Sequence, residues 1–154
     1  MADWHPAYTI IAGVPIALIT SWVTVKLSLR RFQSEKWFER KVDAYTKVID
    51  SLHQMKKLTA RKLRAEESGI EIPENAEKEL LEVYQASHAE LRRLADMGSL
   101  IFSAEAIRAL DELSRDLGAS TPNEGWWLYY DAQSAAINSC LQKIREIGKH
   151  DLNA

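Results

Sequence analysis

The first apolar segment of the chain runs from Pro6 to Val25 and contains no charged residue. As an α-helix it would rise about 30 Å, which matches the hydrocarbon thickness of a bilayer. A cleaved signal peptide is one alternative, but residues 1–5 contain no Lys or Arg and no small-residue cleavage site follows. A buried helix of a soluble protein is the other. The pattern predicts a transmembrane helix over residues 6–29 after a short extracytoplasmic tail of residues 1–5.

The remaining apolar residues recur at three- and four-residue steps, which predicts amphipathic helices. Because no Pro or Gly falls between Lys26 and Ser68, the membrane helix is expected to continue as one rod of about sixty residues, ~90 Å long. Gly69 follows as a C-cap. The apolar row of this helix is Phe38, Val42, Tyr45, Ile49, Leu52, Met55 and Leu63.

Local start and stop signals divide the rest of the chain into three helices. The first begins near Pro73 and ends near Gly98, and the second has Ser103 as its N-cap. The third opens with a capping box over residues 121–124 and continues to Gly148. Their inward residues are Leu80, Tyr84, Leu91 and Leu94, then Ile107, Leu110, Leu113 and Leu117, then Tyr130, Ile137, Leu141 and Ile144.

No segment alternates with a period of two, so the sequence predicts an all-α fold. We expect one N-terminal transmembrane helix that is continuous with the long helix of a four-helix cytosolic bundle. Residues 30–68 form the long basic juxtamembrane helix, residues 69–150 the remaining helices, and residues 151–154 a tail.

Charge is unevenly distributed along the chain, although the net charge is only −2. Residues 26–64 hold twelve Lys/Arg and four Asp/Glu, a net charge of +8, whereas residues 65–154 hold eight and seventeen, a net charge of −9. Basic residues beside a span stay in the cytoplasm. Lys26, Arg30 and Arg31 therefore predict an N-terminus outside the membrane and a C-terminal domain inside it.

One face of the predicted span carries small and hydroxyl-bearing residues within an arc of about 100°. This packing stripe consists of Thr9, Gly13, Ala17, Thr20, Thr24 and Ser28. Small residues allow close approach of helices and hydroxyls bond across the contact, so self-association is expected; bonding of the hydroxyls to their own helix is the alternative. On a continuous helix Arg31 and then Glu35 follow the stripe, which places both at the cytoplasmic mouth of a ring of copies.

Trp126, Trp127, Tyr129 and Tyr130 form an aromatic cluster that points to more than one helical face. Aromatic residues are enriched at the cores of interfaces, so a subunit or partner contact is one interpretation. A core anchor at the start of the last helix is the other.

Motifs for metal or cofactor binding are absent from the sequence. One Cys and four scattered His do not make a zinc site, and there is no Gly-rich phosphate loop or nucleophile elbow. Cys140 lies at helical spacing from Ile137, Leu141 and Ile144, which indicates a buried structural thiol. We therefore expect no metal, no cofactor and no enzyme activity.

One short motif bears on that expectation. Arg145 and His150 have the Arg-x4-His spacing and resemble the motif of HEPN ribonucleases, which are helical bundles. The resemblance implies that Arg145 steadies a phosphate and His150 shuttles a proton at a dimer cleft. Glu146 departs from the family pattern, and Gly148 is expected to end the helix before His150. The alternative is that both side chains are simply solvated.

The layout as a whole, through the span, the basic flank with Arg30 and Arg31, and Arg145 with His150, resembles small bacterial antiviral membrane effectors, in particular the membrane accessory proteins of type VI CRISPR systems. The resemblance implies a homo-oligomeric bacterial inner-membrane effector that forms or gates a pore and depolarises the membrane in phage defence. Its partners would be lipid, further copies of itself, and a cytosolic protein or RNA-guided complex, with no DNA. A membrane-anchored module that recruits a cytosolic partner is one alternative function, and a membrane-tethered HEPN-like ribonuclease is the second.

Overall fold

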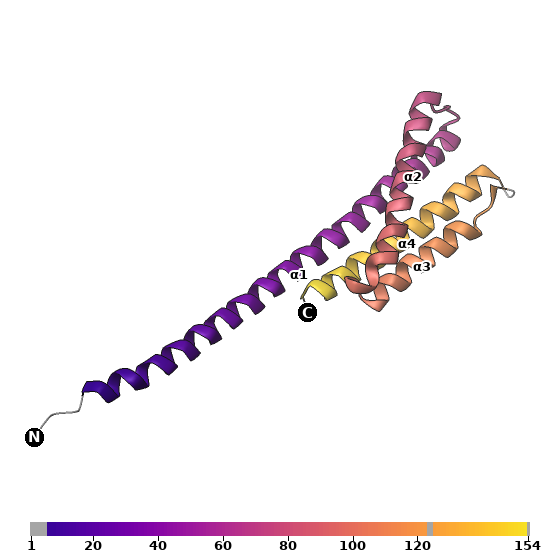
Figure 1. Cartoon of the computed structure of the whole chain (residues 1–154). Coiled ribbons are helices and arrows are strands. Elements are labelled where there is room, and N and C mark those ends of the chain that lie inside the picture. Colours follow the sequence, from indigo (N-terminus) through magenta and orange to yellow (C-terminus); the bar gives the residue numbers. More distant parts are fainter. Residues whose placement is uncertain (1–5, 123–124, 154) are drawn as a thin grey trace, which may run out of the picture. The chain divides into compact units, whose positions relative to one another are not determined.

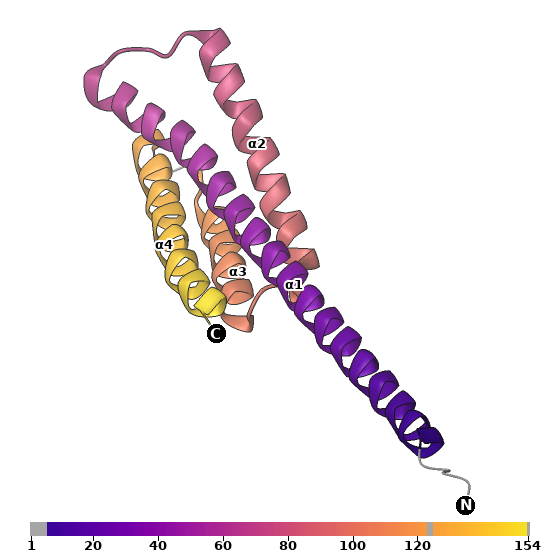
Figure 2. The ribbon, with the colours of Figure 1, turned by 90° about the vertical axis from the view of Figure 1, so that its left-hand side faces the viewer.

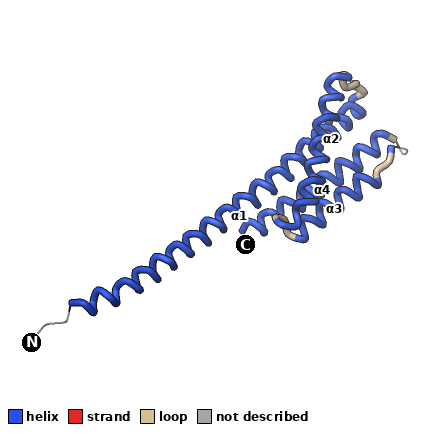
Figure 3. The backbone as a smooth tube through the Cα atoms, in the orientation of Figure 1, coloured by secondary structure: helices blue, strands red, loops and turns tan. Residues whose placement is uncertain are grey.

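The computed structural model describes the backbone of residues 6–122 and 125–153. Within this range the side chains of residues 6–25, 27, 29–33 and 99 lie outside the description. Four α-helices and one short 3-10 turn make up the fold: α1 (Pro6–Ser68), α2 (Glu74–Met97), η1 (Gly98–Leu100), α3 (Ala104–Ala119) and α4 (Trp126–Asn153). Figure 3 shows helices and loops but no strand in the part of the chain that is described. The predicted all-α class is therefore confirmed.

The chain divides into two compact units, residues 1–39 and residues 40–154. The second unit is the helical bundle that the sequence predicts. Its helices α3 and α4 run side by side, with α2 and the C-terminal part of α1 packed on them (Figures 1 and 2).

The core of the bundle draws on all four helices. On α1 the buried side chains recur every three or four residues from Ala44 to Thr59, which places them on one helical face. The buried apolar residues are Ala44, Tyr45, Val48, Leu52, Met55, Leu58, Leu91, Leu94, Phe102, Ala106, Ala109, Leu110, Leu113, Ile137, Cys140, Leu141 and Ile144. Burial raises the pKa of the Cys140 thiol to about 12, which confirms its expected structural role.

Three residues of the predicted apolar row of α1, Phe38, Val42 and half-buried Leu63, are not in this core. Phe38 and Val42 are 51% and 36% exposed, so their assignment to the buried face is wrong. For Val42 the reason is its angle on the helix: it lies six residues, and therefore about 120° around α1, from fully buried Val48, so its side chain points away from the buried face. The amphipathic period alone does not show which part of the apolar side the partner helices cover.

The helix boundaries follow the local signals except in α4. Pro73 precedes α2 and Gly98 follows it, and the hydroxyl of Ser103 accepts a hydrogen bond from the Ala106 amide at 3.4 Å, as predicted for an N-cap. Helix α4 begins only at Trp126, because Gly125 adopts a positive φ of 110° that a helix cannot include. A helix start at the predicted capping box is therefore wrong; residues 123–124 of that box lie outside the described residues.

The predicted end of α4 at Gly148 is also wrong, because the helix continues to Asn153. Gly148 is buried beneath the ring of Tyr45, and a Cβ at that position would lie 3.2 Å from Cδ1 of that ring. The glycine thus permits close packing of α4 on α1 and does not terminate the helix.

The last turn of α4 is joined to α1 through a cluster that we call the C-terminal clasp: Tyr45, Phe102, Ser103 and Asp151. The Tyr45 hydroxyl donates to Oδ2 of Asp151 at 2.5 Å, and the rings of Tyr45 and Phe102 meet edge to face at 5.0 Å. Burial by itself would raise the pKa of the Asp151 carboxyl. Hydrogen bonds from Tyr45 and Ser103 and the charge of Lys41 lower it by more, so the pKa lies below its ordinary value. Burial, and then the bond to Asp151, raises the pKa of Tyr45.

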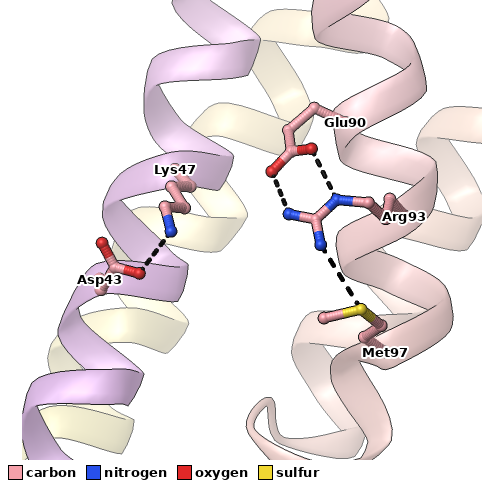
Figure 4. A network of polar contacts seen from close by, with 5 residues as sticks. All are labelled: Asp43, Lys47, Glu90, Arg93 and Met97. Atoms are coloured by element: carbon pink, nitrogen blue, oxygen red, sulfur yellow. Dashed lines mark hydrogen bonds and ion pairs between the residues drawn. The ribbon is translucent and has the colours of Figure 1, made fainter.

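Exposed ion pairs lie on the surfaces of α1 and α2 (Figure 4). Lys47 pairs with Asp43 at 2.6 Å, and Arg93 donates two hydrogen bonds to Glu90 and contacts the sulfur of Met97. The hydrogen bonds from Arg93 lower the pKa of Glu90, with a smaller effect from the charge of Lys47. Such exposed pairs contribute at most about 1 kcal/mol each, so the buried residues determine the stability of the bundle.

Where side chains are described, none of the helices is apolar over a length that would cross a membrane. Of the predicted span over residues 6–29, only the side chains of Lys26 and Ser28 fall within that part of the chain.

Candidate functional site

Three consecutive exposed apolar side chains lie at the start of α4. Trp126, Trp127 and Leu128 are 57%, 46% and 50% exposed, whereas Tyr129 and Tyr130 are half-buried. Consecutive helical residues point about 100° apart, so this first turn cannot place all of its side chains in the core. We call these five residues the aromatic surface.

Three of the four rings of the aromatic surface, those of Trp126, Tyr129 and Tyr130, brace one another. Trp126 stacks on Tyr130 with centroids 6.1 Å apart and meets Tyr129 edge to face at 6.0 Å, and the two tyrosines lie 5.2 Å apart. Lys62 of α1 places Nζ 5.8 Å from the centre of the Tyr130 ring and forms an ion pair with Glu77 of α2. The surface is therefore fixed to α1 and α2 as well as to its own helix.

A polar layer lies beneath these rings. The Tyr84 hydroxyl donates to the amide oxygen of buried Gln133 at 3.2 Å, and burial raises the pKa of Tyr84 to about 12. Burial likewise raises the pKa of Tyr130, although the charge of Lys62 opposes the shift. Both phenols therefore stay neutral at physiological pH and act as hydrogen-bonding and packing groups.

A hollow of about 440 Å³ adjoins the aromatic surface. The turn between α1 and α2 contributes Gly69, Ile70 and Ile72, and Lys62 and Glu77 close the side nearest Tyr130. Ile70 is exposed, and the carboxylates of Glu66 and Glu71 also line the hollow. The region therefore combines apolar and acidic side chains around a concave shape.

The sequence singled out the aromatic cluster but not Lys62 or Ile70. Two signals were available: Gly69 ends α1 immediately before Ile70, and Lys62 is a basic residue almost two turns before that end. The proximity of Lys62 to Tyr130 depends on how α1 packs on α4, which no local pattern encodes.

No hydrogen bond joins Arg145 to His150 in the described structure. The guanidinium of Arg145 lies 3.0 Å from Nε2 of His53 on α1. The imidazole of His150 is 85% exposed, and its nearest acidic partner is Asp151 at 3.8 Å. Because five helical residues turn the chain by about 140°, the two side chains point to different faces of α4.

The residues predicted for membrane packing are only partly described. Thr9, Gly13, Ala17, Thr20 and Thr24 belong to α1, but their side chains lie outside the described residues, as does that of Arg31. Ser28 and Glu35 are exposed. The stripe and the cytoplasmic mouth therefore stay predictions.

Within the described residues, no group of three His, Cys, Asp or Glu side chains is arranged to hold a metal ion. Comparison of the chain with protein-family models, with curated proteins and with solved structures finds no match.

Proposed function

We propose that this protein is a membrane-anchored binding module, whose helical bundle recruits a cytosolic protein through the aromatic surface. The observation that carries the proposal is the exposure of Trp126, Trp127 and Leu128 in one helical turn. Interface cores are enriched in Trp and Tyr, and a few such anchors supply most of the binding energy. Because the Trp126 ring is already braced by Tyr129 and Tyr130, little conformational entropy of this side chain would be lost on binding.

The anchoring half of the proposal rests on the sequence. The uncharged segment of residues 6–25 is long enough to span a bilayer, and Lys26, Arg30 and Arg31 follow it. A tag placed after Ala154 should be labelled only after the inner membrane is permeabilised. Labelling from the periplasmic side, or release of the protein by high salt without detergent, would contradict this topology.

The recruiting half can be tested with a photo-crosslinking amino acid at position 127 of the full-length protein in cells. We expect a discrete crosslinked partner that is lost in the Trp126→Ser variant. The matched control is Leu81→Ser with Val83→Ser, two exposed apolar residues of α2. Equal loss of the crosslinked partner in Trp126→Ser and in the control, or no loss in either, would refute recruitment through the aromatic surface.

A second candidate is the self-assembling pore, and one observation favours it. Trp37 and Phe38 are 49% and 51% exposed on α1, a short distance after the basic flank of the predicted span. Exposed rings there would extend a contact between copies beyond the packing stripe. The role in phage defence belongs to this candidate and rests on the resemblance to antiviral membrane effectors.

The pore candidate is tested by the mass of the detergent-solubilised protein and by membrane depolarisation. Gly13→Leu should abolish assembly, because a bulky side chain prevents close helix approach. Arg31→Glu should preserve assembly and shift ion preference toward cations. A monomeric wild-type protein would eliminate the pore and leave the binding module intact.

A further inference from the structure

The segment of residues 51–65 on α1 contains five Lys/Arg and no acidic residue. Its buried side chains, among them Leu52, Met55 and Thr59, face the core. On the opposite side of the helix stand His53, Lys57, Arg61 and Arg64, at successive steps of four, four and three residues. Such steps place the four side chains in one line within an arc of about 80°. We call this line the cationic row.

Helix α4 adds a further cation at one end of the row. Arg145 directs a guanidinium nitrogen to Nε2 of His53 at 3.0 Å. A guanidinium has only donors, so Nε2 must accept, and the ring proton of the neutral imidazole sits on Nδ1. Two helices of the same bundle unit thus contribute to one basic surface, with Lys57, Arg61, Arg64 and Arg145 all exposed.

Four other basic residues of the bundle, unlike these cations, are neutralised by ion pairs. Lys47, Lys62, Lys143 and Lys149 each form an ion pair with a carboxylate. Within the described residues no ion pair engages Arg61, Arg64 or Arg145, and Lys57 bonds only the amide oxygen of Gln54, at 2.9 Å. The positive charge of the row is therefore not neutralised by the protein itself.

We infer that the cationic row binds the phosphate backbone of a nucleic acid. Eleven residues of helix separate His53 from Arg64, a rise of about 17 Å, which is enough to reach several consecutive phosphates of one strand. Arginine guanidinium groups match phosphate oxygens in a bidentate geometry. An acidic protein partner fits less well, because the row lacks the apolar centre that protein interfaces have.

The inferred mode of binding is independent of sequence. The row contains no Phe, Tyr or Trp ring for base stacking, and contacts to phosphates carry no sequence information. It also uses a face that the aromatic surface does not share, since Lys62, which contacts Tyr130, points about 180° away from His53 around α1. The inference therefore stands whether or not the proposed protein recruitment holds.

The experiment measures binding of fluorescein-labelled 20-nucleotide oligo(U) and oligo(dT) to the full-length protein in a nonionic detergent, by anisotropy at several salt concentrations. We expect both strands to bind, with a slope of log K against log salt of about −3 if four cations each contact one phosphate. Arg61→Gln with Arg64→Gln should weaken binding about tenfold at low salt and reduce the slope by about 1.4. Unlabelled polyglutamate at equal charge should compete poorly.

The matched control is Arg92→Gln with Arg115→Gln, which removes the same charge from exposed positions of α2 and α3. It should bind like the wild type, and circular dichroism should show equal helicity in both double variants. Absence of binding, equal weakening in the control, or efficient competition by polyglutamate would each overturn the inference.

Discussion

Replacing Tyr45 with Phe removes one hydroxyl from the C-terminal clasp and leaves the ring in the core. The change deletes the 2.5 Å hydrogen bond to Asp151 but keeps the edge-to-face contact with Phe102. We expect Tyr45→Phe to lower the free energy of unfolding of the bundle and to loosen the last turn of α4.

The magnitude follows from the partners that remain. A hydrogen bond to a charged group contributes about 1.5–3 kcal/mol. Asp151 keeps Ser103 as a donor and Lys41 as a nearby charge, so Tyr45→Phe should cost about 1.5 kcal/mol, at the lower end of that range. Asp151→Ala should cost more, about 2–3 kcal/mol, because it leaves the buried Tyr45 hydroxyl without its acceptor.

The assay is urea unfolding of the full-length protein in detergent, followed by circular dichroism, for both single variants and the double variant. The double-mutant cycle formed by these variants should give a coupling energy between Tyr45 and Asp151 of about 1–2 kcal/mol at pH 7. The pKa of Asp151 is depressed in the folded state, so its contribution is complete above the ordinary value of 3.8 and is lost as the pH falls through the folded pKa. A coupling energy below about 0.3 kcal/mol, or one that persists at a pH where Asp151 is protonated, would refute this account of the clasp.

Two glycines offer a matched pair of Ala substitutions. Gly118→Ala in α3 meets no atom within 4 Å and should stabilise the bundle by about 0.5 kcal/mol, whereas Gly148→Ala would crowd the pinned ring of Tyr45 and should destabilise it. Thermal unfolding should show a higher melting temperature than the wild type for Gly118→Ala and a lower one for Gly148→Ala. Replacement of Arg145 or His150 by Ala should remove no RNA cleavage, because the two side chains point to different faces of α4; loss of a clear nuclease activity in a well-folded variant would show the opposite.

Much of the fold follows from short-range signals in the sequence. Ser103 caps α3 because its hydroxyl can reach an amide three residues later, and that geometry needs no other helix. The buried spacing of Leu110 and Leu113 in α3 and of Ile137, Leu141 and Ile144 in α4 likewise follows from helical periodicity.

The errors arise where a distant helix decides the outcome. Gly148 looks like a terminator by itself, yet the Tyr45 ring, more than a hundred residues earlier, occupies the space that a side chain would need. No local sequence pattern indicates a role for His53, because its partner Arg145 lies on another helix. Sequence periodicity identifies faces of helices, but the pairing of faces depends on tertiary packing.

The two exposed surfaces of the bundle respond to salt in opposite ways, which permits any captured partner to be assigned. Contacts to the aromatic surface bury apolar rings and are therefore little weakened when ionic strength rises. Contacts to the cationic row release counterions and weaken steeply over the same range. A partner that is retained in high salt and lost in Trp126→Ser belongs to the first surface; one that is released by salt and lost in Arg61→Gln with Arg64→Gln belongs to the second. A partner that fails both criteria uses a different part of the chain, and the packing stripe of α1 is then the next region to test.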